Sequence, residues 1–408
     1  MAERSTPRLR GFLRRGTPVV TLVLWLAAVP AVAQQVTLAL PLERLIALAA
    51  RDSTDPLVLY DLGVGYWVSG DFVQAEAALR RADAIDPRVP EVQLALAYLP
   101  YARRPKLWQE ETKGKVPQAL IPTVDEANRR FRRAYMLDPM VDMRIVGLVI
   151  PPRDAIIIGK NADRYFAALV LGLEYFWGGD YVSAYGSLEE AYSFTTVKDR
   201  DQIPSGVLWY HGLAAAHIGE YPVAIADFRL LLARAVEREK SDSVTRFAVL
   251  PSNNIRYVLA TILRRAGQLD AAREEFQSVL TTDLSFEMAH AQLAEIAEKS
   301  RQWSAAVTER ERALEANPED SGLLLDYGAT LLRAQRYGEA SVALAQAEKA
   351  MPLNARVPYL MGQAAMADGR TEEGMQAFRR FVAIAPSRFE PQVRQLEARY
   401  GSLATPAP

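Results

Sequence analysis

The sequence contains no cysteine, and it has only three histidines among its 408 residues. The absence of cysteine excludes disulfide bonds, thiolate-bound metals, a cysteine nucleophile and a lipid-modified N-terminal cysteine. It says little about the cellular compartment, because an oxidising compartment permits disulfides without requiring them. The formal net charge is only −1 at pH 7. The overall charge therefore does not indicate nucleic acid as a partner.

No set of residues in the sequence has the pattern of a catalytic or metal site. His211 and His217 are six residues apart, so they do not share a helix face, and no acidic residue lies at a spacing that would complete a zinc site. Gly159-Lys160 lacks the preceding glycine and the following serine or threonine of a phosphate-binding loop. We therefore expect no metal, no cofactor and no enzymatic activity. An enzyme with a site built from inserted segments is the least favoured alternative.

The N-terminus has the pattern of an export signal. Five arginines precede the apolar run TPVVTLVLWLAAVPAVA, which ends in small residues at positions 31–33. This pattern predicts a signal peptide, residues 1–33, cleaved after Ala33, and an exported protein that is periplasmic or secreted. The alternative is an uncleaved inner-membrane anchor with the rest of the chain outside the cytoplasm, because no charged residue occurs from Gly16 to Leu42.

Small and large apolar residues recur with a fixed period through most of the chain. In residues 56–87, their spacings place them on facing sides of two antiparallel helices. These residues are Leu62, Gly63, Tyr66, Gly70, Ala75, Leu79, Ala82 and Pro87. In the C-terminal half, the small-residue position recurs every 34 residues, at Ala260, Ala294, Gly328 and Gly362. Four residues depart from the pattern: Arg301 and Gln335 stand where a turn glycine is common, Arg310 stands where a large apolar residue is common, and Gly374 stands where an alanine is common.

This pattern resembles the tetratricopeptide repeat, a helix-turn-helix unit of about 34 residues. The resemblance implies an all-α fold, a right-handed α-solenoid of about eight repeats. We expect an elaborated array in residues 34–252, with insertions near 103–122 and 142–164, and a regular array of four repeats in residues 253–386. The last expected elements are a helix that caps the array and a disordered tail, at residues 387–401 and 402–408.

The two insertions differ in character. The first lengthens the turn of a hairpin by about 18 residues relative to the repeat period. With the helix that follows, it forms what we call the basic patch: Arg103, Arg104, Lys106, Arg129, Arg130, Arg132 and Arg133. Such a patch can hold an acidic partner, an anionic lipid or an anionic polymer, or it can be a solvated surface around a buried Phe131. The second insertion is apolar, and we expect it to pack along the array or to dock another protein.

The first helices of these repeats line a concave surface, which is the expected binding groove. The repeat register predicts that this groove contains Tyr60, Trp67, Leu169, Phe176, Trp177, Trp209, Tyr257 and Arg264. Aromatic side chains in a concave surface suit an extended or helical peptide, although the insertions could instead cover them. The lysine and asparagine set with which some relatives bind a chaperone's C-terminal carboxylate is absent from the corresponding positions, so that activity is not expected.

The resemblance therefore implies a non-enzymatic protein–protein interaction scaffold, and the export signal places it in the cell envelope. We expect a protein or peptide partner bound in the groove, no nucleic acid, and a membrane tether only if the signal stays uncleaved. The alternative function is binding of an envelope polymer or an anionic lipid by the basic patch, residues 103–133. The sequence does not indicate the oligomeric state.

Overall fold

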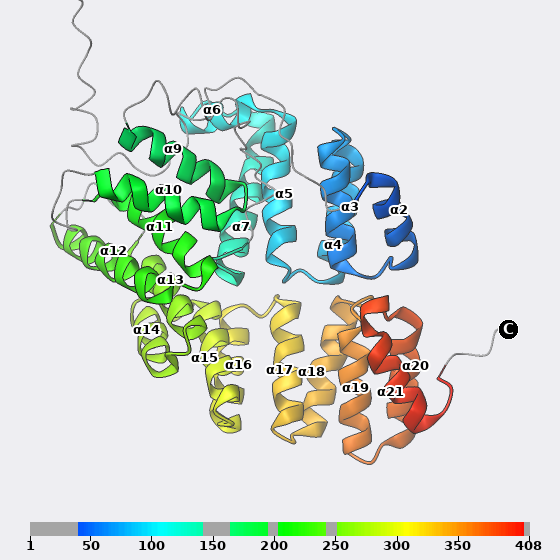
Figure 1. Cartoon of the computed structure of the whole chain (residues 1–408). Helices are drawn as coiled ribbons and strands as arrows, with labels where there is room; N and C mark the ends of the chain where they lie inside the picture. Colours follow the sequence, from blue (N-terminus) through cyan, green and yellow to red (C-terminus); the bar gives the residue numbers. More distant parts are fainter. Residues whose placement is uncertain (1–39, 142–163, 195–202, 242–250, 404–408) are drawn as a thin grey trace, which may run out of the picture. The chain divides into compact units, whose positions relative to one another are not determined.

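The computed structural model describes residues 40–141, 164–194, 203–241 and 251–403. Within these ranges the chain is all-α: helices are joined by short turns, and no β-strand occurs (Figure 1). None of the helices in these ranges has the length and apolar character needed to cross a membrane. The predicted signal segment, residues 1–33, and the apolar insertion, residues 142–164, lie outside the described residues, except that a helix begins at Arg164.

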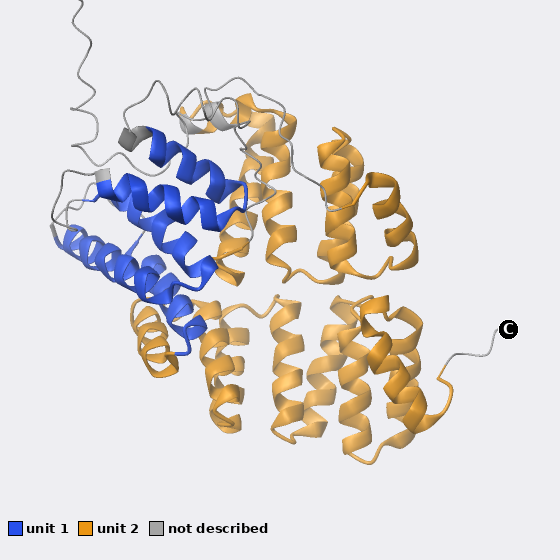
Figure 2. Cartoon of the chain, in the orientation of Figure 1, with its two compact units in different colours: residues 1–36, 146–267 blue, residues 37–145, 268–408 orange. Residues whose placement is uncertain are grey.

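The chain forms two compact units, and each is described by itself (Figure 2). Unit 1 contains α9 (Arg164–Trp177), α10 (Tyr181–Phe194), α11 (Ser205–Ile218), α12 (Tyr221–Ser241) and α13 (Ser252–Arg265). Unit 2 is built from two separate parts of the sequence, 37–145 and 268–408. We call these parts the N-terminal arm and the C-terminal arm of unit 2.

The N-terminal arm contains α2 (Leu42–Arg51), α3 (Pro56–Val68), α4 (Phe72–Ile85), α5 (Pro90–Arg103), α6 (Lys106–Thr112), the 3-10 helix η2 (Gln118–Leu120) and α7 (Ile121–Leu137). The C-terminal arm contains α14 (Leu269–Thr282), α15 (Glu287–Lys299), α16 (Trp303–Ala316), α17 (Ser321–Arg333), α18 (Tyr337–Ala350), α19 (Arg356–Ala367), α20 (Thr371–Ile384), the 3-10 helix η6 (Ser387–Phe389) and α21 (Glu390–Tyr400).

Consecutive helices pack as antiparallel hairpins, as the repeat pattern predicts. The hairpins within the units are α3–α4, α5–α7, α9–α10, α11–α12, α15–α16, α17–α18 and α19–α20. The small-residue position is where the two helices of a hairpin approach most closely. A Cβ added at Gly328 would lie 2.6 Å from Cγ of Leu344, and one at Gly172 would lie 2.6 Å from Cγ of Leu188. Only a residue without a side chain allows these contacts, so the recurring glycines are explained by helix packing.

The lengthened turn between α5 and α7 is folded against its own hairpin. It contains α6 and η2, and its residue Leu107 is only 1% exposed. Leu107 packs with Tyr101, Val124 and Ala127 of the hairpin, and Phe131 packs against the same cluster. The first insertion therefore adds to the apolar core of the N-terminal arm.

The C-terminal end of unit 2 is covered by α21. Leu396 of this helix packs with Phe378 and Phe381 of α20, and the ring of Tyr400 stacks on Phe378 with centroids 5.7 Å apart. Leu403 joins the same cluster and is 1% exposed, so the chain stays packed one residue past the expected start of the tail at 402. Residues 404–408 lie outside the described residues.

Candidate functional site

The N-terminal part of α17 binds the side chain of an arginine that is distant from it in the sequence of unit 2. Arg88, in the turn between α4 and α5, donates from Nη1 to the Asp326 carboxylate and to the carbonyl oxygen of Gly322, the latter at 3.2 Å. The side chains of Arg88 and Asp326 are only 17% and 20% exposed. A Cβ at Gly322 would overlap the aliphatic carbons of Arg88. The glycine therefore lets the arginine stem lie directly on the helix.

A second arginine of the N-terminal arm, Arg133 of α7, binds beside Arg88. Its Nη2 lies 3.0 Å from the carboxylate of Asp320, and its Nε donates to the carbonyl oxygen of Pro87 at 3.2 Å. Asp320 is also the N-cap of α17, because its other oxygen accepts from the backbone N–H of Gly322 at 2.9 Å. We call this group of acceptors, the carboxylates of Asp320 and Asp326 with the Gly322 carbonyl, the arginine site.

The charges in the arginine site stabilise one another. Burial acts to raise the pKa of Asp326, but the guanidinium groups of Arg88 and Arg310 outweigh it and hold the pKa of this carboxyl below its ordinary value. Burial likewise acts to lower the pKa of Arg88, and the carboxylates of Asp326 and Asp320 outweigh it, so the pKa of Arg88 is raised. The Asp326 carboxylate is therefore stabilised in its charged form by the arginines beside it.

Arg310 of α16 connects the arginine site to Glu298 of α15. It lies 3.4 Å from Asp326 and 3.1 Å from Glu298, and it is 4% exposed. Glu298 also accepts from Thr330 at 2.6 Å and from Arg333 at 2.8 Å. The arginine that departs from the repeat pattern at position 310 is therefore a buried cation that positions Asp326 from within the C-terminal arm.

The two arms of unit 2 also contact each other near the start of the N-terminal arm and the end of the C-terminal arm. Oδ1 of Asp52, just after α2, accepts from the backbone N–H of Ser387 at 2.8 Å and from its hydroxyl at 2.6 Å. The Thr54 hydroxyl donates to the carbonyl oxygen of Ile384 at 2.8 Å. Arg388 lies 3.2 Å from Asp55. These contacts and the arginine site join the two arms through hydrogen bonds and ion pairs.

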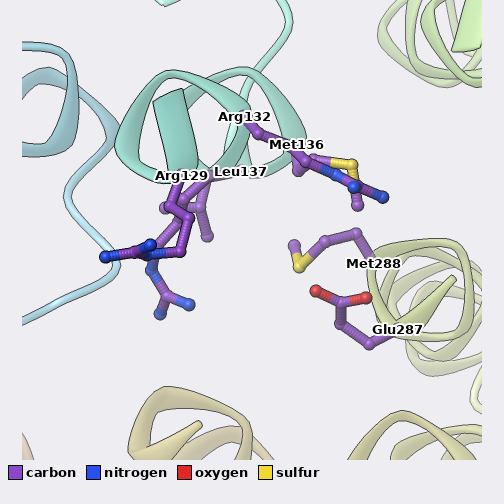
Figure 3. Close-up of a pocket in the computed structure, with 7 residues that line it drawn as sticks. Arg129, Arg132, Met136, Leu137, Glu287 and Met288 are labelled. Atoms are coloured by element: carbon purple, nitrogen blue, oxygen red, sulfur yellow. The ribbon is translucent and has the colours of Figure 1, made fainter. Parts of the chain in front are cut away.

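A pocket of about 170 Å³ lies between α7 and α15 of unit 2. It is lined by Arg129, Arg132, Arg133, Met136, Leu137, Glu287 and Met288. Figure 3 shows Arg132 and Met136 extending from α7 towards Met288, with the Glu287 carboxylate on the opposite wall. Arg129 and Arg132 are exposed, and neither has an ion pair within the described ranges. The pocket therefore combines two free cations with an apolar floor.

Most of the basic patch is engaged in ion pairs within unit 2. Arg103 lies 2.8 Å from Glu76, and Arg104 lies 2.8 Å from Glu110. Arg130 contacts Asp83 at 3.1 Å and Glu126 at 3.0 Å, and Arg133 contacts Asp320. The members that remain exposed without an ion pair to a described residue are Lys106, Arg129 and Arg132. Binding of an anionic partner by the patch stays a prediction, and these three residues are the ones available for it.

The residues predicted for the groove fall into two groups. Leu169, Phe176 and Tyr257 are at most 4% exposed, so they lie in the packed interior of unit 1 and offer almost no surface to a partner. Partly exposed members are Trp177, Trp209 and Arg264 in unit 1, and Tyr60 and Trp67 in unit 2. In unit 1, the rings of Trp177 and buried Phe176 both pack on Tyr210, at 5.9 and 5.2 Å between centroids. Contact of the exposed members with a partner stays a prediction.

One buried polar group in unit 1 was not anticipated from the sequence. His211, in α11, is 2% exposed, and its Nδ1 and Nε2 lie 2.6 and 2.7 Å from carboxylate oxygens of Asp227 and Glu189. The two carboxylates hold the buried imidazole from both sides and connect α11 to α10 and α12. No group of three or more potential metal ligands occurs in the described ranges. The sequence signal that could have shown this group is a histidine at a repeat position that usually holds leucine.

Comparisons with known proteins bear on the fold. Residues 330–389 match the tetratricopeptide repeat family. No match was found among curated proteins. A solved structure of MamA protein is 15% identical, with a TM-score of 0.38, and the match covers 50% of this chain and 98% of MamA.

Two further solved structures cover more of the chain. One is a tetratricopeptide repeat protein from Parabacteroides merdae, with 14% identity, a TM-score of 0.38, and coverage of 74% of this chain and 97% of that one. The other is yeast Tom70, with 14% identity, a TM-score of 0.37, and coverage of 88% and 91%. The helical hairpins described above give the chain an all-α helical-repeat fold of the α-solenoid class, in which residues 330–389 match the tetratricopeptide repeat family.

Proposed function

We propose that the protein is a non-enzymatic scaffold of the cell envelope that binds a protein or peptide partner through its helical repeats. Tetratricopeptide-like folds are commonly protein–protein interaction scaffolds. The observation that carries the proposal is the pair of partly exposed tryptophans on the first helices of consecutive hairpins in unit 1, Trp177 of α9 and Trp209 of α11. Each rests on buried rings, Trp177 on Tyr210 and Trp209 on Phe228. Rigidly supported aromatic side chains at a surface are typical anchors of protein interfaces.

Loss of these two rings tests the proposal. The full chain carrying Trp177→Ala and Trp209→Ala is compared with the wild type in a pull-down from envelope extract, read by mass spectrometry. We expect the partners of the wild type to be lost, because truncating an aromatic anchor lowers affinity by about 2 kcal/mol or more. The matched control is Tyr175→Ala, which removes a ring that is 39% exposed on the same helix α9. Retention of all wild-type partners by the double variant would contradict a role for this surface.

The envelope location rests on the pattern of residues 1–33. A basic segment followed by an apolar run and small residues supports export with cleavage after Ala33. Sequencing the N-terminus of the protein recovered from cells tests this, and an intact Met1 in a membrane fraction would favour the anchored form.

A second candidate is an anion-binding role for the pocket between α7 and α15. It is supported by the two cations that line the pocket without ion pairs to described residues, Arg129 and Arg132. The same pull-down separates this candidate from the first. Charge reversal by Arg129→Glu and Arg132→Glu should remove a partner that binds the pocket, and the wild-type interaction should weaken strongly with added salt.

A further inference from the structure

The arginine site has the features of a binding site that the chain fills with its own side chains. Its acceptors all belong to α17 and its N-cap, whereas two of its cations come from the other arm, 234 to 238 residues away for Arg88 and 187 residues away for Arg133. Each carboxylate also has a partner in its own arm. Asp320 accepts from the backbone of α17 as its N-cap, and Asp326 pairs with Arg310.

The shape of the site fits an arginine side chain. Gly322 leaves room on the first turn of α17 for the aliphatic stem, and its carbonyl oxygen and the Asp326 carboxylate receive the guanidinium at the end of that stem. The Asp320 carboxylate receives the second guanidinium at 3.0 Å, and that side chain of Asp320 is only 2% exposed. Buried carboxylates beside a backbone acceptor select arginine, whose several donors satisfy them at once.

The contact between the arms is suited to opening. Hydrogen bonds and ion pairs join the arms at the arginine site and at Asp52, Thr54 and Asp55, and ion pairs weaken with salt and can exchange with other partners. If the N-terminal arm moves away, Asp320 loses its ion pair with Arg133, and Asp326 loses Arg88 and keeps the cations of its own arm, Arg310 and Arg356. Carboxylates in that state attract an external cation.

We propose that the arginine site binds an arginine-bearing basic segment of a partner protein, and that Arg88 and Arg133 occupy it as an intramolecular ligand when the arms are closed. This goes beyond the proposed function, because the site lies in unit 2 and does not involve Trp177 or Trp209. When the arms are closed, the chain's own arginines block the site, so an external ligand binds only the molecules that are open. Its apparent affinity is the intrinsic affinity multiplied by the open fraction.

Removing the internal ligand tests the proposal. Binding of a fluorescein-labelled synthetic peptide that carries two arginines is measured by fluorescence anisotropy with purified full-length protein. The variant Arg88→Ala, Arg133→Ala should bind this peptide about tenfold more tightly than the wild type, because the internal competitor is gone. Adding Asp320→Asn and Asp326→Asn to that variant should abolish the gain, and asparagine keeps the N-cap of α17.

A control variant distinguishes binding at the arginine site from a general effect of removing positive charge. Arg44→Ala, Arg81→Ala removes the same number of positive charges from the same arm, at exposed residues that belong neither to the arginine site nor to the pocket between α7 and α15. This control should bind the peptide as the wild type does. Equal gains for both double variants, or no gain for a folded Arg88→Ala, Arg133→Ala variant, would overturn the proposal. If alanine at these positions prevents folding, the variant Arg88→Gln, Arg133→Gln removes the charges and retains most of each aliphatic stem. The same results then support or overturn the proposal.

Discussion

At the scale of single residues, Arg301 and Gln335 show how a repeat tolerates a missing glycine. Both have positive φ, 56° and 62°, the conformation that Gly267 and Gly369 adopt at the equivalent turns with φ of 78° and 79°. Both side chains are exposed. A left-handed backbone is unfavourable for residues with a side chain, by about 1–2 kcal/mol. These two turns therefore carry local strain that packing of the hairpins maintains.

Replacing Gln335 by glycine should relieve that strain. We expect Gln335→Gly to raise the free energy of unfolding by about 0.5 kcal/mol, since the greater freedom of glycine in the unfolded chain offsets part of the gain. Urea denaturation measures the change. The reciprocal control, Gly369→Gln, introduces the same side chain at a φ of 79° and should destabilise the protein. Stabilisation by both substitutions would show that backbone strain is not the cause.

Asp326 gives a second residue-scale prediction, which concerns pH. Its pKa in the folded protein lies below its ordinary value of about 3.8 because of Arg88 and Arg310, although burial opposes this. A lowered folded pKa means that the carboxylate stabilises the protein at all pH values above the ordinary one, and that this contribution is lost as the pH falls through the folded pKa. Asp326→Asn should therefore lower the unfolding free energy by about 2 kcal/mol at neutral pH.

The difference between the wild type and Asp326→Asn should stay constant from pH 7 to about pH 5 and shrink below about pH 4, as the pH falls from the ordinary pKa of the carboxyl through its lowered pKa in the folded protein. Denaturation series at several pH values provide the measurement. Asp270→Asn is a suitable control, because that carboxylate is 91% exposed and pairs only with Arg273 of the same helix. A difference that is the same at pH 3 and pH 7 would mean that the carboxylate charge has no role.

At the scale of helices, much of the fold could be predicted from the sequence because each hairpin is a local pattern. The positions of glycine and alanine in the sequence predict that α17 pairs with α18 and α19 with α20, because these residues occur where two helices must approach closely. The displacement of the α7 pattern from its expected place predicts a lengthened turn after α5, and in the structure α6 and η2 lie between α5 and α7. The short helix α6 inside that turn was not predicted, because its seven residues are stabilised by the burial of Leu107 against other helices and not by local propensity.

The candidate sites could be predicted only in part, and for a physical reason. A repeat register predicts which residues share a helix face, but it does not predict which surfaces of the array contact each other. Tyr257 was therefore assigned to a surface, although in the structure it is fully buried. The arginine site depends on Arg88 meeting Asp326 across 238 residues, and no local pattern carries that information. The sequence shows that Arg310 departs from the repeat pattern, but it does not show which carboxylates pair with this arginine.

At the scale of the molecule, unit 2 is one body whose two arms are separated by residues 146–267 in the sequence. The contact of Asp52 with Ser387 joins residues 335 positions apart. Because the chain contains no cysteine, two cysteines introduced at these positions are the only thiols present. Oxygen atoms of the two native side chains lie 2.6 Å apart, so thiols at the same positions are expected to be close enough to react when the arms are closed.

We expect Asp52→Cys, Ser387→Cys to form an intrachain disulfide under mild oxidation, detected as a reducible shift in gel mobility and confirmed by mass spectrometry of the linked peptides. Because charged and polar contacts join the arms, the rate of crosslinking should fall at high salt and fall further when Arg88→Ala is added. The pair Asp52→Cys, Ser341→Cys is the control, since Ser341 of α18 bonds within the C-terminal arm, to Arg370. Equal crosslinking of both pairs, or crosslinks only between chains, would show that the arms are not held together by these contacts, and would remove the structural basis for an internal ligand at the arginine site.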